Sequence, residues 1–204
     1  MKCLENRNTG GFTLIELLVS MGIGMVVLAA VSTTFMSQTR FYSAQEQVNE
    51  MAQNARGALD MITREIKMAG YNPVGYVPAD PLFFNGVTVS GTTQLQIRAD
   101  LNGVSGIQNN TNENITYAYN NSTLQITRTL GGGTAQVLAD NITALTFTCY
   151  EADGSTTTTT SSDIRQVKID ITARTANPDP NYTANGGYQT YTVSATITPT
   201  NLAL

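Results

Sequence analysis

The sequence predicts an α+β protein, in which one long N-terminal helix packs on an antiparallel β-sheet head. An apolar run extends from Phe12 to Phe35, and apolar residues then recur every three or four positions as far as residue 70. From Tyr71 onward the period changes to two. Spacings of three and four match one face of a helix, whereas a period of two matches the faces of a strand. The predicted parts are a polar start at 1–11, an apolar helix at 12–35, its amphipathic continuation at 36–70 and a head at 71–204.

The composition excludes several kinds of active site. The 204 residues include no histidine, and only 13% are charged, against about 25% in typical soluble proteins. Without histidine there is no Ser-His-Asp triad, no Cys-His nucleophile and no histidine-ligated zinc. Paired carboxylates need a cleft, and Asp153 and Asp163 lie in a polar segment. The sequence therefore predicts no enzyme, no cofactor and no small-molecule substrate.

The charge balance argues against nucleic acid as a partner. The chain carries 11 Lys and Arg against 15 Asp and Glu, a net charge of −4, and its basic residues form no cluster. Binding to phosphates by counterion release depends on such clusters. We therefore expect no nucleic-acid binding.

The apolar run at Phe12–Phe35 is long enough to cross a bilayer. A helix rises about 1.5 Å per residue, so about 20 residues span the hydrocarbon layer. Lys2 and Arg7 predict that the polar start stays in the cytoplasm and that the head faces outward. A secretory signal peptide is the alternative interpretation, but its cleavage site follows the apolar run, whereas the small pair Gly10-Gly11 precedes it.

Glu16 is the one charged residue of this run. An isolated acidic side chain in a membrane helix costs about 2.5–3.5 kcal/mol on insertion scales, so it indicates a function and requires a partner. No Lys or Arg lies between Arg7 and Arg40. If the chain is cut after Gly11, Phe12 gains an ammonium group that can pair with the Glu16 carboxylate of the next subunit. The alternative is that Glu16 lies at the headgroup level and snorkels.

The segment Gly11–Val19 resembles the signature of type IV prepilins and type II secretion pseudopilins. A short basic leader, a glycine, a phenylalanine, a glutamate four residues later and an apolar helix occur together in it. The resemblance implies that the polar start is a leader peptide, which a prepilin peptidase removes by cutting after Gly11. It also implies a type IV pilin-like fold, an N-methylated Phe12, an assembly role for Glu16, and an apolar helix that serves first as a membrane anchor and then in the filament core.

Two glycines occupy the stretch in which many pilin helices carry a proline. No proline occurs in this helix, and Gly22 and Gly24 lie at the comparable place. Glycine weakens a helix locally and lets a neighbouring helix approach closely. We therefore predict that these two residues serve helix packing.

A second resemblance concerns the end of the predicted helix. Residues 56–71 are similar to the helix end of PilW-type minor pilins and also resemble the J-type minor pseudopilin of type II secretion. Later in the chain, Thr172–Thr175 with Asp179-Pro180 resembles the end of PilW-type domains. The resemblance implies an inner-membrane precursor with a periplasmic head. Its partners would be prepilin peptidase and other major and minor pilins, and its role assembly, priming or tip formation of a type IV pilus at the cell surface. A type II secretion pseudopilin and a monomeric membrane-anchored surface-binding domain remain as alternatives.

The head shows alternating segments that predict antiparallel strands in one sheet over the helix. These segments are residues 86–90, 94–99, 115–119, 124–128, 142–150, 164–174 and 190–198. Asn120–Ser122 predicts a hairpin turn between two of them. The polar segments 153–163 and 175–187 predict exposed loops, where we expect any contacts of the head with partners.

Two features of the head allow a chemical and a structural interpretation. Asp100–Gly103 matches the start of a calcium loop, but no acidic residue follows at the place of the bidentate ligand, and a simple turn explains the pattern equally well. We therefore predict no metal site. Cys149 lies in an alternating segment and is expected to be a small buried hydrophobic residue, while Cys3 belongs to the leader, so no disulfide is expected within the mature chain.

Overall fold

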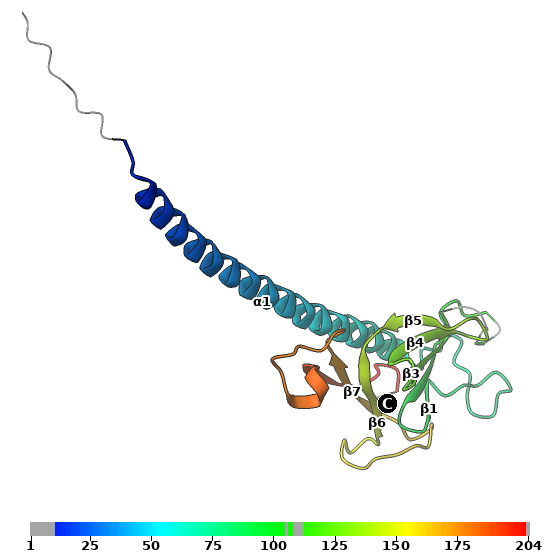
Figure 1. The fold of residues 1–204 in the computed structure, drawn as a ribbon. Helices are drawn as coiled ribbons and strands as arrows, with labels where there is room; N and C mark the ends of the chain where they lie inside the picture. The colour runs from blue at the N-terminus through cyan, green and yellow to red at the C-terminus, as the bar shows by residue number, and fades with distance from the viewer. Residues whose placement is uncertain (1–10, 105, 108–111, 203–204) are drawn as a thin grey trace, which may run out of the picture. The chain divides into compact units, whose positions relative to one another are not determined.

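The computed structural model describes residues 11–104, 106–107 and 112–202. The chain divides into two compact units, Met1–Gln45 and Glu46–Leu204, which are described separately. Helix α1 extends over Leu14–Met68 and contributes to both units (Figure 1). Of the predicted leader, only Gly11 lies within the described residues.

The described part of the first unit consists of the start of α1 and the three residues before it. Its large apolar side chains are exposed, including Phe12 at 91% and Leu28 at 67%. By length and composition α1 can cross a membrane, and none of its most apolar stretch is buried inside the structure. This half of the helix therefore lacks the apolar environment that its side chains require.

In the second unit α1 presents one apolar stripe to the head. Val48 and Leu59 are partly buried along it and pack against the same core. The stripe ends at Gly70, which has φ of 77° and whose N–H donates to the carbonyl of Arg98 at 2.9 Å. A left-handed glycine directly after the last turn is a common helix stop. The fully buried side chains of the stripe are Met51, Ala55, Ala58, Ile62, Ile66 and, just after the helix, Ala69.

The described strands of the head form two antiparallel sheets. The first has the order β1-β2-β3-β4-β5 and the second the order β6-β7-β8. The strands of the first sheet are β1 (Val87–Ser90), β2 (Gln94–Arg98), β3 (Asn114–Asn120), β4 (Gln125–Leu130) and β5 (Gln136–Ala139). Those of the second are β6 (Ile142–Tyr150), β7 (Gln166–Arg174) and β8 (Thr190–Ile197).

The prediction of a single sheet was wrong, and the error lies at the junction of β5 and β6. Only two residues separate these strands, and the second, Asn141, has a left-handed backbone with φ of 58°. This sharp turn directs β6 away from the first sheet, while the Ile142 N–H still donates to the carbonyl of Leu124 at 2.9 Å. Strand β5 itself was not predicted, because it is four residues long and follows the glycine-rich stretch at Gly131–Gly133.

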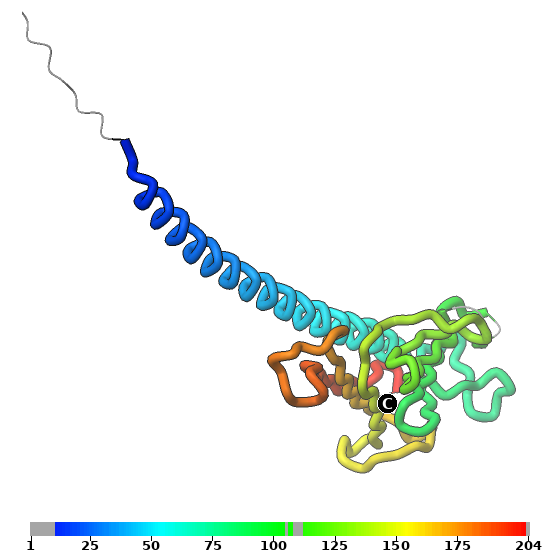
Figure 2. Tube along the Cα trace, in the orientation of Figure 1, coloured from blue at the N-terminus to red at the C-terminus, as the bar shows by residue number. Residues whose placement is uncertain are grey.

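Both sheets contribute to one core around the second half of α1. Leu95, Ile115 and Ile126 come from the first sheet, and Leu145 and Ile169 from the second; all five are at most 2% exposed. In Figure 2 the chain of the head lies against the end of the helix. The predicted α+β class is confirmed, and every strand expected from alternation is present: β6 has the predicted ends, and the ends of the others differ by at most two residues.

Candidate functional site

The site that the sequence singles out begins in the non-helical chain before α1. Gly11 and Phe12 both precede the first helical residue, Leu14, and both are exposed. Apart from its chain neighbours, no atom of the described residues lies within 4 Å of a Cβ built on Gly11. The peptide bond after Gly11 is therefore free of secondary structure and of packing, as a peptidase substrate requires.

Glu16 closes the first turn of the helix. Its Oε2 accepts a hydrogen bond from the Thr13 N–H at 2.9 Å and one from the Thr13 hydroxyl at 2.8 Å, while the Glu16 N–H donates to Thr13 Oγ1 at 3.3 Å. This reciprocal pairing is a capping box, in which Thr is the N-cap and Glu the third helical residue. This capping box was not predicted, although Thr13–Glu16 has the T-x-x-E spacing that signals one.

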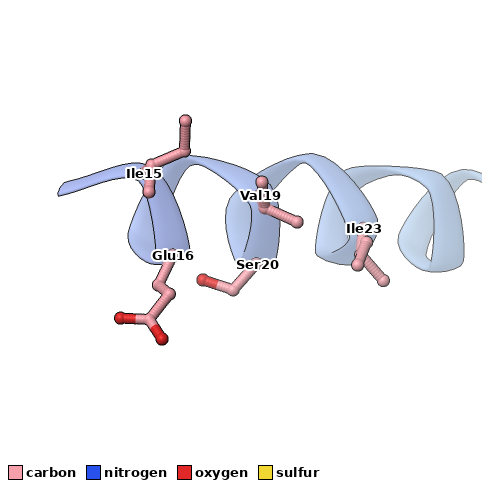
Figure 3. A pocket seen from close by; sticks show the side chains of 5 residues that line it. All are labelled: Ile15, Glu16, Val19, Ser20 and Ile23. Atoms are coloured by element: carbon pink, nitrogen blue, oxygen red, sulfur yellow. The ribbon is translucent and has the colours of Figure 1, made fainter. Parts of the chain in front are cut away.

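The hydrogen bonds of the capping box do not neutralise the negative charge of Glu16, and the described chain provides no positive charge to pair with it. None of the ion pairs among the described residues includes Glu16, and the next basic residue is Arg40. Figure 3 shows the Glu16 carboxylate pointing away from the helix, and an open groove lies beside it. The groove is lined by Ile15, Glu16, Val19, Ser20 and Ile23. A single carboxylate on an apolar surface is suited to a cationic group supplied by another chain.

Gly22 and Gly24, in the exposed half of α1, make no packing contact with the described part of the chain. A Cβ built on Gly22 or Gly24 meets no atom within 4 Å. The stretch around them is exposed, and only Gly24 is partly covered. The contacts that would require glycine at these positions therefore have to come from outside the chain.

In the head, the segment considered for calcium forms a turn. The Gly103 N–H donates to Asp100 Oδ1 at 2.7 Å, and the Val104 N–H donates to Asn102 Oδ1 at 2.8 Å. Within the described residues, no group of three or more Cys, Asp or Glu side chains is placed to hold a metal ion. These hydrogen bonds match the turn interpretation of the sequence.

Cys149 is 4% exposed and belongs to the core, so the prediction of a buried small hydrophobic residue is confirmed. Burial raises the pKa of its thiol to about 11. A thiol that is protonated and covered at neutral pH is unreactive.

An ionic cluster inside the head was not predicted. Glu65 on α1 accepts hydrogen bonds from Arg128 on β4 and from the Tyr117 hydroxyl on β3, the latter at 2.5 Å. Burial raises the pKa of Tyr117, and the hydrogen bond to Glu65 raises it further. Charged residues are usually exposed, and no local pattern in the sequence signals that strands far along the chain cover Glu65.

Comparison with known proteins gives a sequence match at the start of the chain and a similar solved structure. A sequence model of the prokaryotic N-terminal methylation motif matches residues 6–32, the stretch that holds the predicted cut and Glu16. A solved type IV-like pilin from Thermus thermophilus is similar at 13% identity with a TM-score of 0.49, over 76% of this chain and 100% of that chain. No curated protein matches the sequence.

The larger match covers most of the head and the second half of the helix. The model of the family described as prepilin peptidase-dependent protein B matches residues 44–197. With the methylation motif, it confirms the resemblance to type IV minor pilins. The chain belongs to the prepilin peptidase-dependent protein B family.

Proposed function

We propose that this protein is a minor pilin, a structural subunit that takes part in assembly, priming or tip formation of a type IV pilus. The observation that carries the proposal is the carboxylate of Glu16, which lies on an exposed apolar helix with no ion-pair partner in the described chain. Prepilin peptidase cuts after Gly11, and the new N-terminus at Phe12 is methylated. The family match and the methylation motif support this processing.

The exposed apolar half of α1 lies in two environments in turn, first the membrane and then the filament. Before assembly it anchors the precursor in the inner membrane, with the leader in the cytoplasm and the head in the periplasm. After assembly the same apolar side chains pack against the helices of other pilins. Gly22 and Gly24 let these helices approach closely, because neither carries a side chain that separates two backbones.

The charge of Glu16 guides this transfer. In the membrane an acidic side chain without a cationic partner is unfavourable by about 2.5–3.5 kcal/mol. Pairing with the N-terminal ammonium group of a neighbouring subunit removes that cost only in the assembled state. The partners are therefore prepilin peptidase and other pilins, and catalysis has no part in the function.

The test must separate the charge of Glu16 from its capping role. Glu16→Gln keeps a side chain that can cap the helix but removes the charge, whereas Thr13→Ala removes the cap and keeps the charge. Incorporation is measured as the amount of the protein in sheared filaments relative to membranes. Glu50→Gln, an exposed acid farther along α1, is the matched control.

We expect Glu16→Gln to reduce incorporation by about tenfold or more, because the pair that favours the filament is lost. Thr13→Ala and Glu50→Gln should incorporate within about twofold of the wild type, because both keep the Glu16 carboxylate that forms the pair. If Glu16→Gln incorporates normally while Thr13→Ala fails, the role of Glu16 is helix capping and the proposal is wrong.

A further inference from the structure

Strand β8 leaves one side of its backbone unpaired. It is the last strand of the order β6-β7-β8 and pairs with β7 from Arg174↔Thr190 to Val167↔Ile197. Among the described residues, the hydrogen bonds of the chain give its backbone no partner on the other side. A free edge of this kind is a row of donors and acceptors that can take another strand.

The register shows which groups face the free side. Just beyond the end of the ladder, the Thr175 N–H donates to the carbonyl of Gln189 at 2.9 Å, which makes these two residues a hydrogen-bonded pair of the same register. Hydrogen-bonded and non-bonded pairs alternate along an antiparallel ladder. The residues of β8 whose backbone N–H and C=O point outward are therefore Thr190, Thr192, Ser194 and Thr196.

The other sheet edges among the described strands are short or covered. Strands β1 and β5 have four residues each. The outer side of β6 is engaged by other segments, because the Phe147 N–H donates to the carbonyl of Thr92 at 2.7 Å and the Cys149 carbonyl accepts from Thr158 at 2.9 Å. Short or covered edges are the usual protection of a sheet against unwanted pairing.

Strand β8 has none of these protections. It has eight residues, TYTVSATI, which include no charged residue and no proline, and its pairing with β7 has no bulge. Every residue type in it except alanine and serine favours strands. The length and composition of this edge therefore suit pairing with a further strand.

The two faces of β8 define what such a strand looks like. Tyr191, Val193 and Ala195 are half-buried and pack against the core, whereas the four outward-bonding residues expose their hydroxyl side chains. On the exposed face of the adjacent strand, Lys168 Nζ lies 2.9 Å from Asp170 Oδ2, and the guanidinium of Arg174 lies over the ring of Tyr188, 4.1 Å from its centroid. A partner strand that extends both faces is uncharged, with apolar side chains alternating with small polar ones.

We infer that β8 accepts an extended strand from the head of another pilin-type subunit, which adds to the three-stranded sheet as its fourth strand. Only polypeptide backbone complements a row of alternating N–H and C=O groups over eight residues. The inference rests on the proposed function, which supplies neighbouring subunits with β-rich heads.

Hydrogen exchange provides the first test, because strand addition protects alternate amides. The processed full-length protein is compared in detergent and in sheared filaments, with residue-resolved readout. We expect the amides of Thr192, Ser194 and Thr196 to slow by about tenfold or more in filaments, whereas those of Val193 and Ala195, already bonded to β7, change little. Unchanged exchange at the three outward amides overturns the inference, and so does equal slowing at all five, which indicates general burial.

A variant provides the second test. Thr192→Pro removes one outward N–H without breaking the ladder to β7, and proline is tolerated at such edge positions. Thr192→Ala, which keeps the N–H, is the matched control. Retained folding is shown by a Cys149 thiol that stays unreactive. We expect Thr192→Pro to reduce incorporation into filaments by about tenfold while Thr192→Ala leaves it unchanged.

The outcomes separate this inference from the proposed function. If Glu16→Gln abolishes incorporation but folded Thr192→Pro incorporates normally, the protein is a pilin whose β8 edge is not used, and the inference fails alone. If the purified protein by itself forms dimers with the alternating protection at β8, a second copy is the occupant, and the assignment to another subunit is wrong. If the precursor is never cut, the proposed function fails, whatever the exchange of β8 shows.

Discussion

Arg128 on β4 binds Glu65 on α1 through two nitrogens, with Nη2 2.8 Å and Nε 3.1 Å from Oε1 of the carboxylate. Both side chains are largely covered, at 17% and 13% exposure. Burial acts to lower the pKa of Arg128, but the hydrogen bond and the charge of Glu65 raise it on balance. The pair joins the helix to the first sheet at a place where water screens little.

Removing the charge of Glu65 should destabilise the head. Glu65→Gln leaves a covered guanidinium without its counter-charge, which we expect to lower the free energy of unfolding by about 2 kcal/mol. Asp60→Asn, which breaks the exposed ion pair with Arg64, is the control and should cost less than about 0.5 kcal/mol. Urea unfolding of the detergent-solubilised protein measures both. If both variants lower the free energy of unfolding by the same small amount, the buried pair has no stabilising role.

Gly86 should tolerate no side chain, because it packs on the end of the helix. A Cβ built there lies 2.6 Å from Gly70 Cα and 2.9 Å from the Ala69 carbonyl carbon, both backbone atoms that cannot rotate away. We expect Gly86→Ala to lower the free energy of unfolding by about 1–3 kcal/mol.

Gly57 provides the opposite case on the same helix. A Cβ there meets no atom within 4 Å, so Gly57→Ala should stabilise the protein by about 0.5–1 kcal/mol through helix propensity. Thermal unfolding of Gly86→Ala and Gly57→Ala measures both effects. A destabilised Gly57→Ala would show that this face of the helix is packed against something.

Because of the Cys149 thiol, the free energy of unfolding depends on pH in the alkaline range. Its pKa rises from 9.0 to about 11 on folding, so the folded state favours the protonated form. The stabilisation is present in full below pH 9 and declines between pH 9 and about 11, because the unfolded thiol ionises first. Cys149→Ala should remove this part of the decline, as measured by urea unfolding from pH 7.5 to 10.5. An identical slope in wild type and variant would contradict the assignment.

The sequence predicted the helix and the strands for simple physical reasons. The stripe from Met51 to Ala69 has helical spacing, and strands such as Ile142–Tyr150 alternate strictly, so local pattern and burial agree. The division into two sheets depends on one left-handed residue, Asn141, which alternation does not reveal. The Glu65 cluster depends on contacts across 52 and 63 positions of sequence, and residue type alone does not place them.

The candidate site was predictable in its residues but not in all of its contacts. Glu16 was singled out by its charge in an apolar run, which is a property of sequence alone. Its hydrogen bonds with Thr13 were not predicted, because a charge in an apolar run indicates an ionic partner and gives no sign of a local cap. The free edge of β8 became visible only when the strand order was known.

The most direct test of the account is the intact mass of the protein from sheared surface filaments and from membranes of the same cells, with Glu16→Gln in parallel. We predict that the species in the filaments is lighter than the uncut chain by the mass of residues 1–11 and heavier by one methyl group, and that the variant loses this species from the filaments but not from the membranes. An uncut protein that is confined to the membrane and indifferent to Glu16 would contradict it.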